Sequence, residues 1–438
     1  MYKGKQLTLF DIEVEPNMEE ERIDNEDRSG SFVDNMKLPL HRWFRFSAGF
    51  SAEWVEKVIR EKRAGDSFTV LDPFVGSGTT LIASDKLGVT SIGVEAHPFV
   101  ARIAKGKLAW NSPVINFINQ ARNILELASS NKVAEMQDIP KLIADCYSLQ
   151  SMNKLYSLRN AWLHLNDGSQ ASELVWLAIT AILRGTSKAG TAQWQYILPN
   201  KEKKNITEPY EAFQAQTAMM VKDIKEFQQQ VTKSKALLIN GDARSLSTIG
   251  RESIDMVITS PPYANNYDYA DATRLEMTFW GEVASWGDLH NKVRNKLIVS
   301  SSQHASKEKL ELDELLQRSE LDPIRSEITL VCRALAQERL SHGGKKHYHT
   351  MIAAYFSDLS NVFRELRRVC KSGSTLCFII GDSAPYGVYV PVEKWLGDLA
   401  VFWGFKTYHF EKLRDRNTKW KNRKHRVPLH EGRLWIEG

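Results

Sequence analysis

The stretch Asp255-Met256-Val257-Ile258-Thr259-Ser260-Pro261-Pro262-Tyr263 joins an apolar run to two prolines and an aromatic residue. The apolar run predicts a buried parallel strand, which ends abruptly because proline cannot donate a hydrogen bond to a neighbouring strand. In a doubly wound α/β sheet, ligands bind at this end of the strands. A serine hydroxyl, a proline carbonyl and an aromatic ring at that end can hold a flat NH2 group and stack on the ring that carries it. Taken alone, the stretch is equally compatible with an ordinary strand and turn.

A second motif lies nearer to the amino terminus. Residues 68–71 predict a buried strand, and the sequence Asp-Pro-Phe-Val-Gly-Ser-Gly-Thr-Thr at 72–80 follows it and opens a helix. Its glycines at 76 and 78 permit a tight turn and the close approach of a ligand to the start of that helix. The P-loop pattern is absent. A second strand, 90–95, ends in Glu95, where a carboxylate is the expected partner of ribose hydroxyls.

The α/β pattern resumes after a long interruption. A strand at 236–239 precedes Asp242, whose carboxylate can accept a hydrogen bond from an adenine amino group. We predict a helix at 267–280, a polar stretch with little signal at 281–349, and then further elements up to the carboxyl end. These are helices at 350–368 and 392–403 and strands at 375–380, 405–410 and 434–436.

The interruption, residues 100–235, is predicted to be helical throughout, with apolar residues at helical spacing in 117–127, 171–183 and 212–227. It contains a loop at 184–196 that is rich in small polar and aromatic residues. We interpret it as an inserted helical domain and a candidate nucleic-acid surface, although a solvated loop between helices explains the same residues.

Composition places the chain among ordinary globular proteins. Its 438 residues predict two or three domain-sized units, with 42% hydrophobic and 25% charged residues. No apolar run approaches the roughly 20 residues that span a bilayer, and the first residues do not resemble a signal peptide. The four cysteines form no C-x-x-C pair, which favours the cytoplasm and predicts neither disulfides nor a zinc site.

Charge is unevenly distributed along the chain. The net charge is +5, but residues 11–27 carry nine acidic residues and residues 412–426 carry eight basic ones. This pattern predicts a polyanionic partner for the folded part. The candidate phosphate-binding residues are Arg414, Arg416, Lys419, Lys421, Arg423 and Lys424, and the alternative is a solvated loop beside a strand.

Two short segments have weaker interpretations. Gln6-Leu7-Thr8-Leu9-Phe10 resembles the peptides with which bacterial DNA-processing proteins dock into the sliding clamp, although an edge strand packed on its own domain is an alternative. His342, His347 and His349 lie close together, but without accompanying carboxylate or cysteine ligands they predict a flexible basic loop and no metal site.

Together, the motifs at 72–80, Glu95, 241–243 and 259–263 resemble those of the S-adenosylmethionine-dependent DNA amino-methyltransferases, which methylate the exocyclic nitrogen of cytosine or adenine. The resemblance covers about 38–110, 236–281 and 350–437. It implies an α/β fold, a Rossmann-like seven-stranded class I methyltransferase sheet with one antiparallel strand near the carboxyl end and an inserted helical domain. The expected division is an acidic tail at 1–37, a cofactor-binding half at 38–110, a helical insert for target recognition at 111–235, and a catalytic half at 236–438 that includes a variable region at 281–349.

The resemblance also implies roles for individual residues. Those expected to bind S-adenosylmethionine are Asp72, Pro73, Phe74, Gly76, Gly78, Thr79, Glu95, Asp242 and Ala243. The catalytic set, expected to hold the target base, is Ser260, Pro261, Pro262 and Tyr263. Residues 41–50 match a further cofactor-binding element loosely.

These roles predict a site-specific DNA methyltransferase that acts on a flipped base in double-stranded DNA. In the family, serine at position 260 goes more often with cytosine N4 and aspartate with adenine N6, so cytosine is favoured. The alternatives are adenine N6, an RNA amino-methyltransferase, and a non-catalytic DNA-binding subunit. A cognate restriction or defence nuclease is the expected functional partner.

Overall fold

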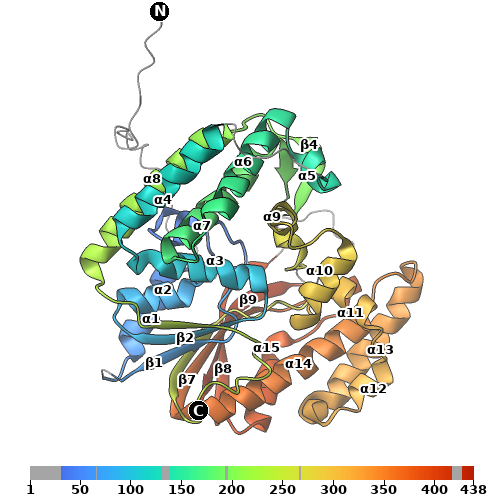
Figure 1. Ribbon diagram of the computed structural model, residues 1–438. Coiled ribbons are helices and arrows are strands. Elements are labelled where there is room, and N and C mark those ends of the chain that lie inside the picture. Colours follow the sequence, from blue (N-terminus) through green and yellow to red (C-terminus); the bar gives the residue numbers. More distant parts are fainter. Residues whose placement is uncertain (1–30, 66, 131–137, 193–195, 266–267, 417–426) are drawn as a thin grey trace, which may run out of the picture.

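The computed structural model describes residues 31–438 except 66, 131–137, 193–195, 266–267 and 417–426 (Figure 1). A seven-stranded sheet in the order β5-β2-β1-β6-β7-β9-β8 forms its centre. Strand β9 is antiparallel to both of its neighbours, and the other pairings are parallel. This confirms the predicted Rossmann-like methyltransferase sheet with one antiparallel strand near the carboxyl end. The strands are β1 (Thr69–Asp72), β2 (Thr90–Glu95), β5 (Ala236–Asn240), β6 (Ile254–Thr259), β7 (Cys370–Gly381), β8 (Thr407–Arg416) and β9 (Leu429–Glu437).

The central strands are apolar on both faces because helices cover both faces. On β6, Met256 and Ile258 pack with the helices near the amino terminus, whereas Val257 packs into a second core built on later helices. All three side chains are fully buried. A near-continuous apolar run is therefore the pattern that this position in the sheet requires.

The helices around the sheet include those predicted from apolar spacing. Helix α1 begins after Ser51, whose side chain accepts a hydrogen bond from the backbone N–H of Trp54. Helices α14 and α15 run beside the later strands (Figure 1). The helices of this part are α1 (Ala52–Lys62), α2 (Thr79–Lys86), α3 (Pro98–Leu108), α14 (Tyr348–Val369) and α15 (Val392–Phe402).

The described residues within 111–235 form a mainly helical layer above the sheet (Figure 1). Its core also takes in Trp43, Phe99 and Phe279, which lie outside that range. The expectation of helices throughout is wrong at one place, where β3 (Ala189–Thr191) pairs with β4 (Ile197–Glu202) as antiparallel strands. Strand β3 lies within the predicted loop at 184–196, and β4 follows that loop. The helices are α4 (Val114–Ser129), α5 (Lys141–Cys146), α6 (Leu149–Leu165), α7 (Gln170–Thr186) and α8 (Pro209–Gln230).

The segment that follows β6 contains more helix than its sequence indicates. The helix predicted at 267–280 is shorter than expected: a 3-10 turn at Asp271–Thr273 leads into α9 (Arg274–Trp280), and residues 266–267 lie outside the described residues. Several of the helices after it are too short to show a helical period in the sequence. They are α10 (Trp286–Lys292), α11 (Ser302–Glu308), α12 (Leu312–Leu316) and α13 (Arg325–Ser341).

The order of the strands in the sheet determines where a ligand site is expected. The chain builds the sheet outward from β1 through β2 to β5, and then returns to lay β6 on the other side of β1. Such a reversal opens a crevice at the carboxyl ends of the two central strands. Asp72, Glu95 and Ser260 lie at the ends of β1, β2 and β6. Within the described residues, no helix combines the length and the apolar character needed to cross a membrane.

Candidate active site

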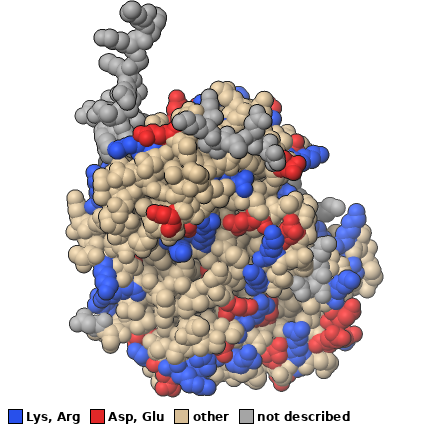
Figure 2. All heavy atoms as spheres, viewed as in Figure 1, with Lys and Arg blue, Asp and Glu red and all other residues tan. Residues whose placement is uncertain are grey.

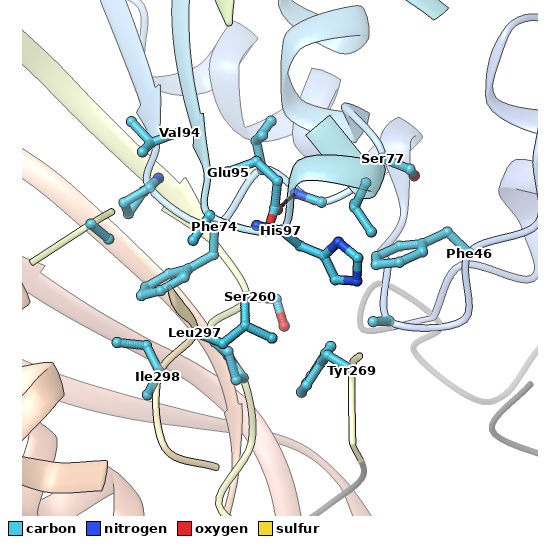
Figure 3. A pocket seen from close by; sticks show the side chains of 18 of the residues that line it. Phe46, Phe74, Ser77, Val94, Glu95, His97, Ser260, Tyr269, Leu297 and Ile298 are labelled. Carbon is cyan, nitrogen blue, oxygen red and sulfur yellow. Dashed lines mark hydrogen bonds between the residues drawn. The ribbon is translucent and has the colours of Figure 1, made fainter. Parts of the chain in front are cut away.

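A pocket lies at this reversal and holds about 850 Å³ of space, part of it open to solvent. Its walls come from segments that are far apart in the sequence. Figure 3 shows Glu95, His97 and Ser260 around the same space, with Phe46 and Phe74 on opposite sides of it.

Asp72 connects the two motifs from behind the pocket wall. Its buried carboxylate accepts hydrogen bonds from the hydroxyl of Thr80 at 2.6 Å and from the hydroxyl of Thr259 at 2.6 Å. A third bond comes from the backbone N–H of Phe74 at 3.1 Å. Burial raises the pKa of Asp72 to about 6, although these three donors oppose the shift. Asp72 does not line the pocket, so its expected cofactor role would be exerted through the loop that it holds.

The loop after β1 adopts the tight turn that its glycines predict. Gly76 and Gly78 have φ values of 54° and 94°, in the left-handed region that favours glycine. A side chain at Gly76 would also begin 3.0 Å from the ring of Phe46. Of the predicted cofactor residues in this loop, Pro73, Phe74, Gly76 and Thr79 line the pocket, whereas Gly78 lies behind them at the start of α2.

Glu95 borders the pocket and also holds this loop in place. One carboxylate oxygen accepts the backbone N–H of Gly76 at 2.8 Å, and the other accepts that of His97 at 2.9 Å. Burial raises the pKa of Glu95 to about 7, and the charge of Asp72 adds to the shift. The carboxylate is therefore poised to change its charge near neutral pH.

Asp242 and Ala243 line the pocket where the sequence predicts adenine contacts. The carboxylate of Asp242 already accepts hydrogen bonds from Arg244, the shortest at 2.6 Å. Arg244 also bonds Asp358 at 2.9 Å, and Asp358 accepts the backbone N–H of Val299 at 3.1 Å. This chain of contacts fixes the segment 296–300, which supplies several further lining residues. These are Lys296, Leu297, Ile298 and Ser300.

The Ser260–Tyr263 turn forms the side of the pocket at the end of β6. The Ser260 hydroxyl donates to the carbonyl of Ile379 on β7 at 3.2 Å. Ser260 and Pro262 line the pocket, and Pro261 is buried. The backbone N–H of Tyr263 donates to the Tyr269 hydroxyl at 3.3 Å.

The ring of Tyr263 lies against a cation. The Arg416 guanidinium is 5.3 Å from the ring centre. Burial raises the pKa of Tyr263 well above its usual value, and Glu431 adds to that shift while Arg416 opposes it. Tyr263 is therefore a neutral aromatic surface over the whole working pH range.

Sequence reasoning missed several pocket residues. His97 is 2% exposed, and its Nε2 lies 3.0 Å from the Thr273 hydroxyl. Burial lowers the pKa of His97 to about 3, so the ring is neutral. Its only signal is its position two residues after Glu95. Tyr269 was hidden inside a predicted helix, whereas Phe46 and Phe50 fall in the loosely matched segment 41–50.

The structure describes only two of the predicted phosphate-binding residues, Arg414 and Arg416. Arg414 pairs with Glu431 at 2.9 Å, and Arg416 donates to the carbonyl of Asp382 at 2.9 Å. Lys419, Lys421, Arg423 and Lys424 lie outside the described residues, as does the clamp-like peptide Gln6–Phe10. Figure 2 shows basic and acidic side chains interspersed over the visible face. DNA contact by these arginines and lysines stays a prediction.

The fold and the pocket define a class of protein. The sheet order is that of a class I methyltransferase domain. The glycine loop against Glu95 and the Ser260–Tyr263 turn lie at one pocket, as the resemblance to the amino-methyltransferases implies.

Comparison with known proteins agrees with this class. The model of a DNA methylase family, of the N6/N4 type, matches residues 10–106. The chain is 25% identical over 430 residues to the Type II methyltransferase M.BsoBI of Geobacillus stearothermophilus, across 88% of this chain and 82% of that protein. It is 24% identical over 405 residues to the Type II methyltransferase M.AvaI of Nostoc sp., across 86% and 81%. The resemblance to the DNA amino-methyltransferases of the N4/N6 type is thereby confirmed.

Proposed function

We propose that this protein is a site-specific DNA methyltransferase that moves a methyl group from S-adenosylmethionine to the N4 amino group of a flipped cytosine in double-stranded DNA. The observation that carries the proposal is the Ser260–Pro261–Pro262–Tyr263 turn, which borders the same pocket as Glu95 and Phe74. An acceptor for an amino group and a cradle for a nucleoside cofactor therefore share one space.

The pocket suits S-adenosylmethionine. Glu95 offers a carboxylate for ribose hydroxyls, and Phe46 and Phe74 offer aromatic walls. Gly76 brings backbone close to the ligand without a side chain in the way. The other cofactor residues that we propose are Asp72, Pro73, Gly78, Thr79, Asp242 and Ala243. When bound, the cofactor supplies a sulfonium methyl group that an amine can attack.

The protein's own contribution is to turn a poor nucleophile towards that methyl group. The lone pair of an exocyclic amino group is delocalised into the base. The Ser260 hydroxyl donates to the carbonyl of Ile379 and also interacts with the Tyr263 side chain, and its oxygen would accept an N–H of the base. If the Pro261 carbonyl accepts the second N–H, the nitrogen shifts towards tetrahedral and its lone pair points away from the ring plane. Positioning of this kind lowers a barrier by several kcal/mol.

The target base has to leave the duplex to reach this turn. Tyr263 would then stack on it, which is worth about 1–3 kcal/mol per base. After transfer the nitrogen loses a proton. Serine is a weak proton acceptor, so that proton passes to water or to a neighbouring group.

Serine at position 260 supports cytosine as the target, and adenine N6 is the alternative. The relatives M.BsoBI and M.AvaI, named as Type II methyltransferases, support a modification role beside a cognate restriction nuclease. The division into a cofactor half, a helical insert that recognises the target and a catalytic half remains part of the proposal.

The test uses labelled S-adenosylmethionine and unmethylated duplex DNA, followed by digestion to nucleosides and mass spectrometry. We expect N4-methylcytosine from the wild type. Ser260→Ala should lower turnover by at least about 100-fold, the usual cost of losing one fixed polar contact in a reaction centre. Cofactor affinity should stay unchanged and serves as the folding control.

N6-methyladenine would keep the mechanism and overturn the choice of base. Label in RNA alone would overturn the choice of substrate. Normal turnover by Ser260→Ala would refute the role of the serine.

A further inference from the structure

Three side chains outside the proposed chemistry converge at the end of β7. Asp382 follows that strand, Glu393 lies in the first turn of α15, and His430 lies on β9. One possible ligand atom from each lies within 4.8 Å of the others. Among the residues that the structure describes, these three are the one group of histidine, cysteine and carboxylate side chains whose ligand atoms lie close enough together to hold a metal ion.

The cluster holds carboxylate oxygens that lack hydrogen-bond donors. Asp382 is 2% exposed, and one of its oxygens, Oδ1, accepts the backbone N–H of His430 at 2.8 Å. The other, Oδ2, lies 3.0 Å from His430 Nδ1 but receives no hydrogen bond. Glu393 Oε2 is likewise buried without a partner. Oε1 of Glu393 lies 3.4 Å from His430 Nε2 and accepts a bond of 3.4 Å from the Tyr389 hydroxyl.

Two carboxylates and an imidazole in one place need a cation or protons to balance them. A nitrogen and an oxygen about 3 Å apart match two neighbouring ligands of one ion whose bonds are about 2.0–2.2 Å long. Mixed imidazole and carboxylate ligands suit divalent transition metals.

We propose that Asp382, Glu393 and His430 bind one divalent transition-metal ion, with Zn²⁺ as the representative probe. The ion joins the end of β7 to α15 and β9. The three ligands come from separate elements, so no short sequence spacing predicts the site.

The site adjoins the proposed base pocket. The carbonyl of Asp382 accepts the Arg416 guanidinium at 2.9 Å, and that guanidinium lies over the Tyr263 ring. An ion that fixes Asp382 would therefore also fix the support of Tyr263. Its role is structural, because methyl transfer to an amino group needs no metal.

The test measures metal binding directly. The untagged full-length protein is stripped with EDTA, dialysed and titrated with ZnCl2 by calorimetry, and the metal content is then measured by mass spectrometry. We expect one Zn²⁺ per chain. Asp382→Asn and Glu393→Gln should each weaken binding by more than about 100-fold, above the 10- to 100-fold cost of losing an outer-shell partner.

The variants are chosen to preserve the fold. Asn at 382 keeps the Oδ1 acceptor of the His430 N–H, and circular dichroism checks the folding of both variants. Asp398→Asn, on the same helix as Glu393 but outside the cluster, is the matched control and should bind like the wild type. Absence of stoichiometric Zn²⁺ in the wild type would overturn the proposal. Unchanged affinity in Asp382→Asn and Glu393→Gln would place the metal elsewhere and overturn it as well.

Discussion

Glu95 should make cofactor binding depend on pH near neutrality. Its pKa is raised to about 7 by burial, and bound ribose hydroxyls favour the charged carboxylate. Affinity for S-adenosylmethionine should therefore be highest above pH 7 and fall as the carboxylate is protonated below it. With a pKa of about 7, about one carboxylate in eleven is charged at pH 6 and about ten in eleven at pH 8, so the affinity at pH 6 should be about tenfold below that at pH 8.

Glu95→Gln should remove this dependence and weaken binding. Both carboxylate oxygens accept backbone N–H groups, from Gly76 and His97. A glutamine offers one oxygen, and its NH2 group must face the other N–H. Loss of a charge-assisted bond to the ribose costs about 1.5–3 kcal/mol, which corresponds to about a 10- to 150-fold weaker affinity.

The assay is calorimetric titration of S-adenosylmethionine between pH 5.5 and 8.5 on the wild type and on Glu95→Gln. The cofactor's own amino group also titrates near this range, so the difference between the two proteins isolates Glu95. Glu53→Gln, an exposed glutamate on α1, is the matched control. Thermal unfolding separates a binding defect from a folding defect. A wild-type affinity that is flat from pH 6 to 8, or an identical slope in Glu95→Gln, would refute the assigned charge change.

Two further predictions concern a buried lysine and the support of Tyr263. Burial lowers the pKa of Lys107 to about 7, so between pH 7 and its unfolded value of about 10.4 the unfolded chain holds a proton that the folded chain has released. Relative to Lys107→Met, the wild type's free energy of unfolding should therefore rise with pH by up to about 1.4 kcal/mol per unit. Urea denaturation of both proteins at pH 7 and pH 9 measures this, and an equal difference in free energy of unfolding at the two pH values would contradict the prediction. Arg416→Ala should lower turnover about 2- to 30-fold, because the cation–π contact with Tyr263 is worth about 0.5–2 kcal/mol, with cofactor affinity as the control. If it instead changes only salt-dependent DNA affinity, Arg416 is a phosphate contact.

The sheet was predictable because its signals are local. Apolar runs that end in glycine, proline or a carboxylate mark β1, β2 and β6, and those endings are also the motifs. Parallel strands with both faces covered need such runs, so burial and pattern agree. The helices at 348–369 and 392–402 were predictable for the same reason, since each is long enough to show its period.

The rest depends on contacts between distant segments. Nothing near Lys296–Ser300 indicates a pocket wall, because its position follows from Arg244 and Asp358. The β3–β4 pair could not be predicted because its strands are short and polar, so apolar and polar residues do not alternate over enough positions to indicate a strand. Arg416 resembled a phosphate contact from charge density alone, whereas its partners, Asp382 and Tyr263, are set by the sheet.

Asp72 explains why the two motifs work as one unit. Thr80 belongs to the glycine-rich motif and Thr259 to the motif at 259–263, and Thr259 lies 187 positions from Asp72. Both hydroxyls donate to the same buried carboxylate, which lies at the end of β1 beside β6. A buried carboxylate is costly unless its oxygens are satisfied, so each threonine stabilises the position of the other through it. The cofactor loop and the Ser260 turn are thereby held in a fixed relation, which an attack on a methyl group requires. The carboxylate at position 72 is thus a geometric element of the site that acts from behind the pocket wall, and its conservative replacement by asparagine would leave one of the two hydroxyls facing an amide donor.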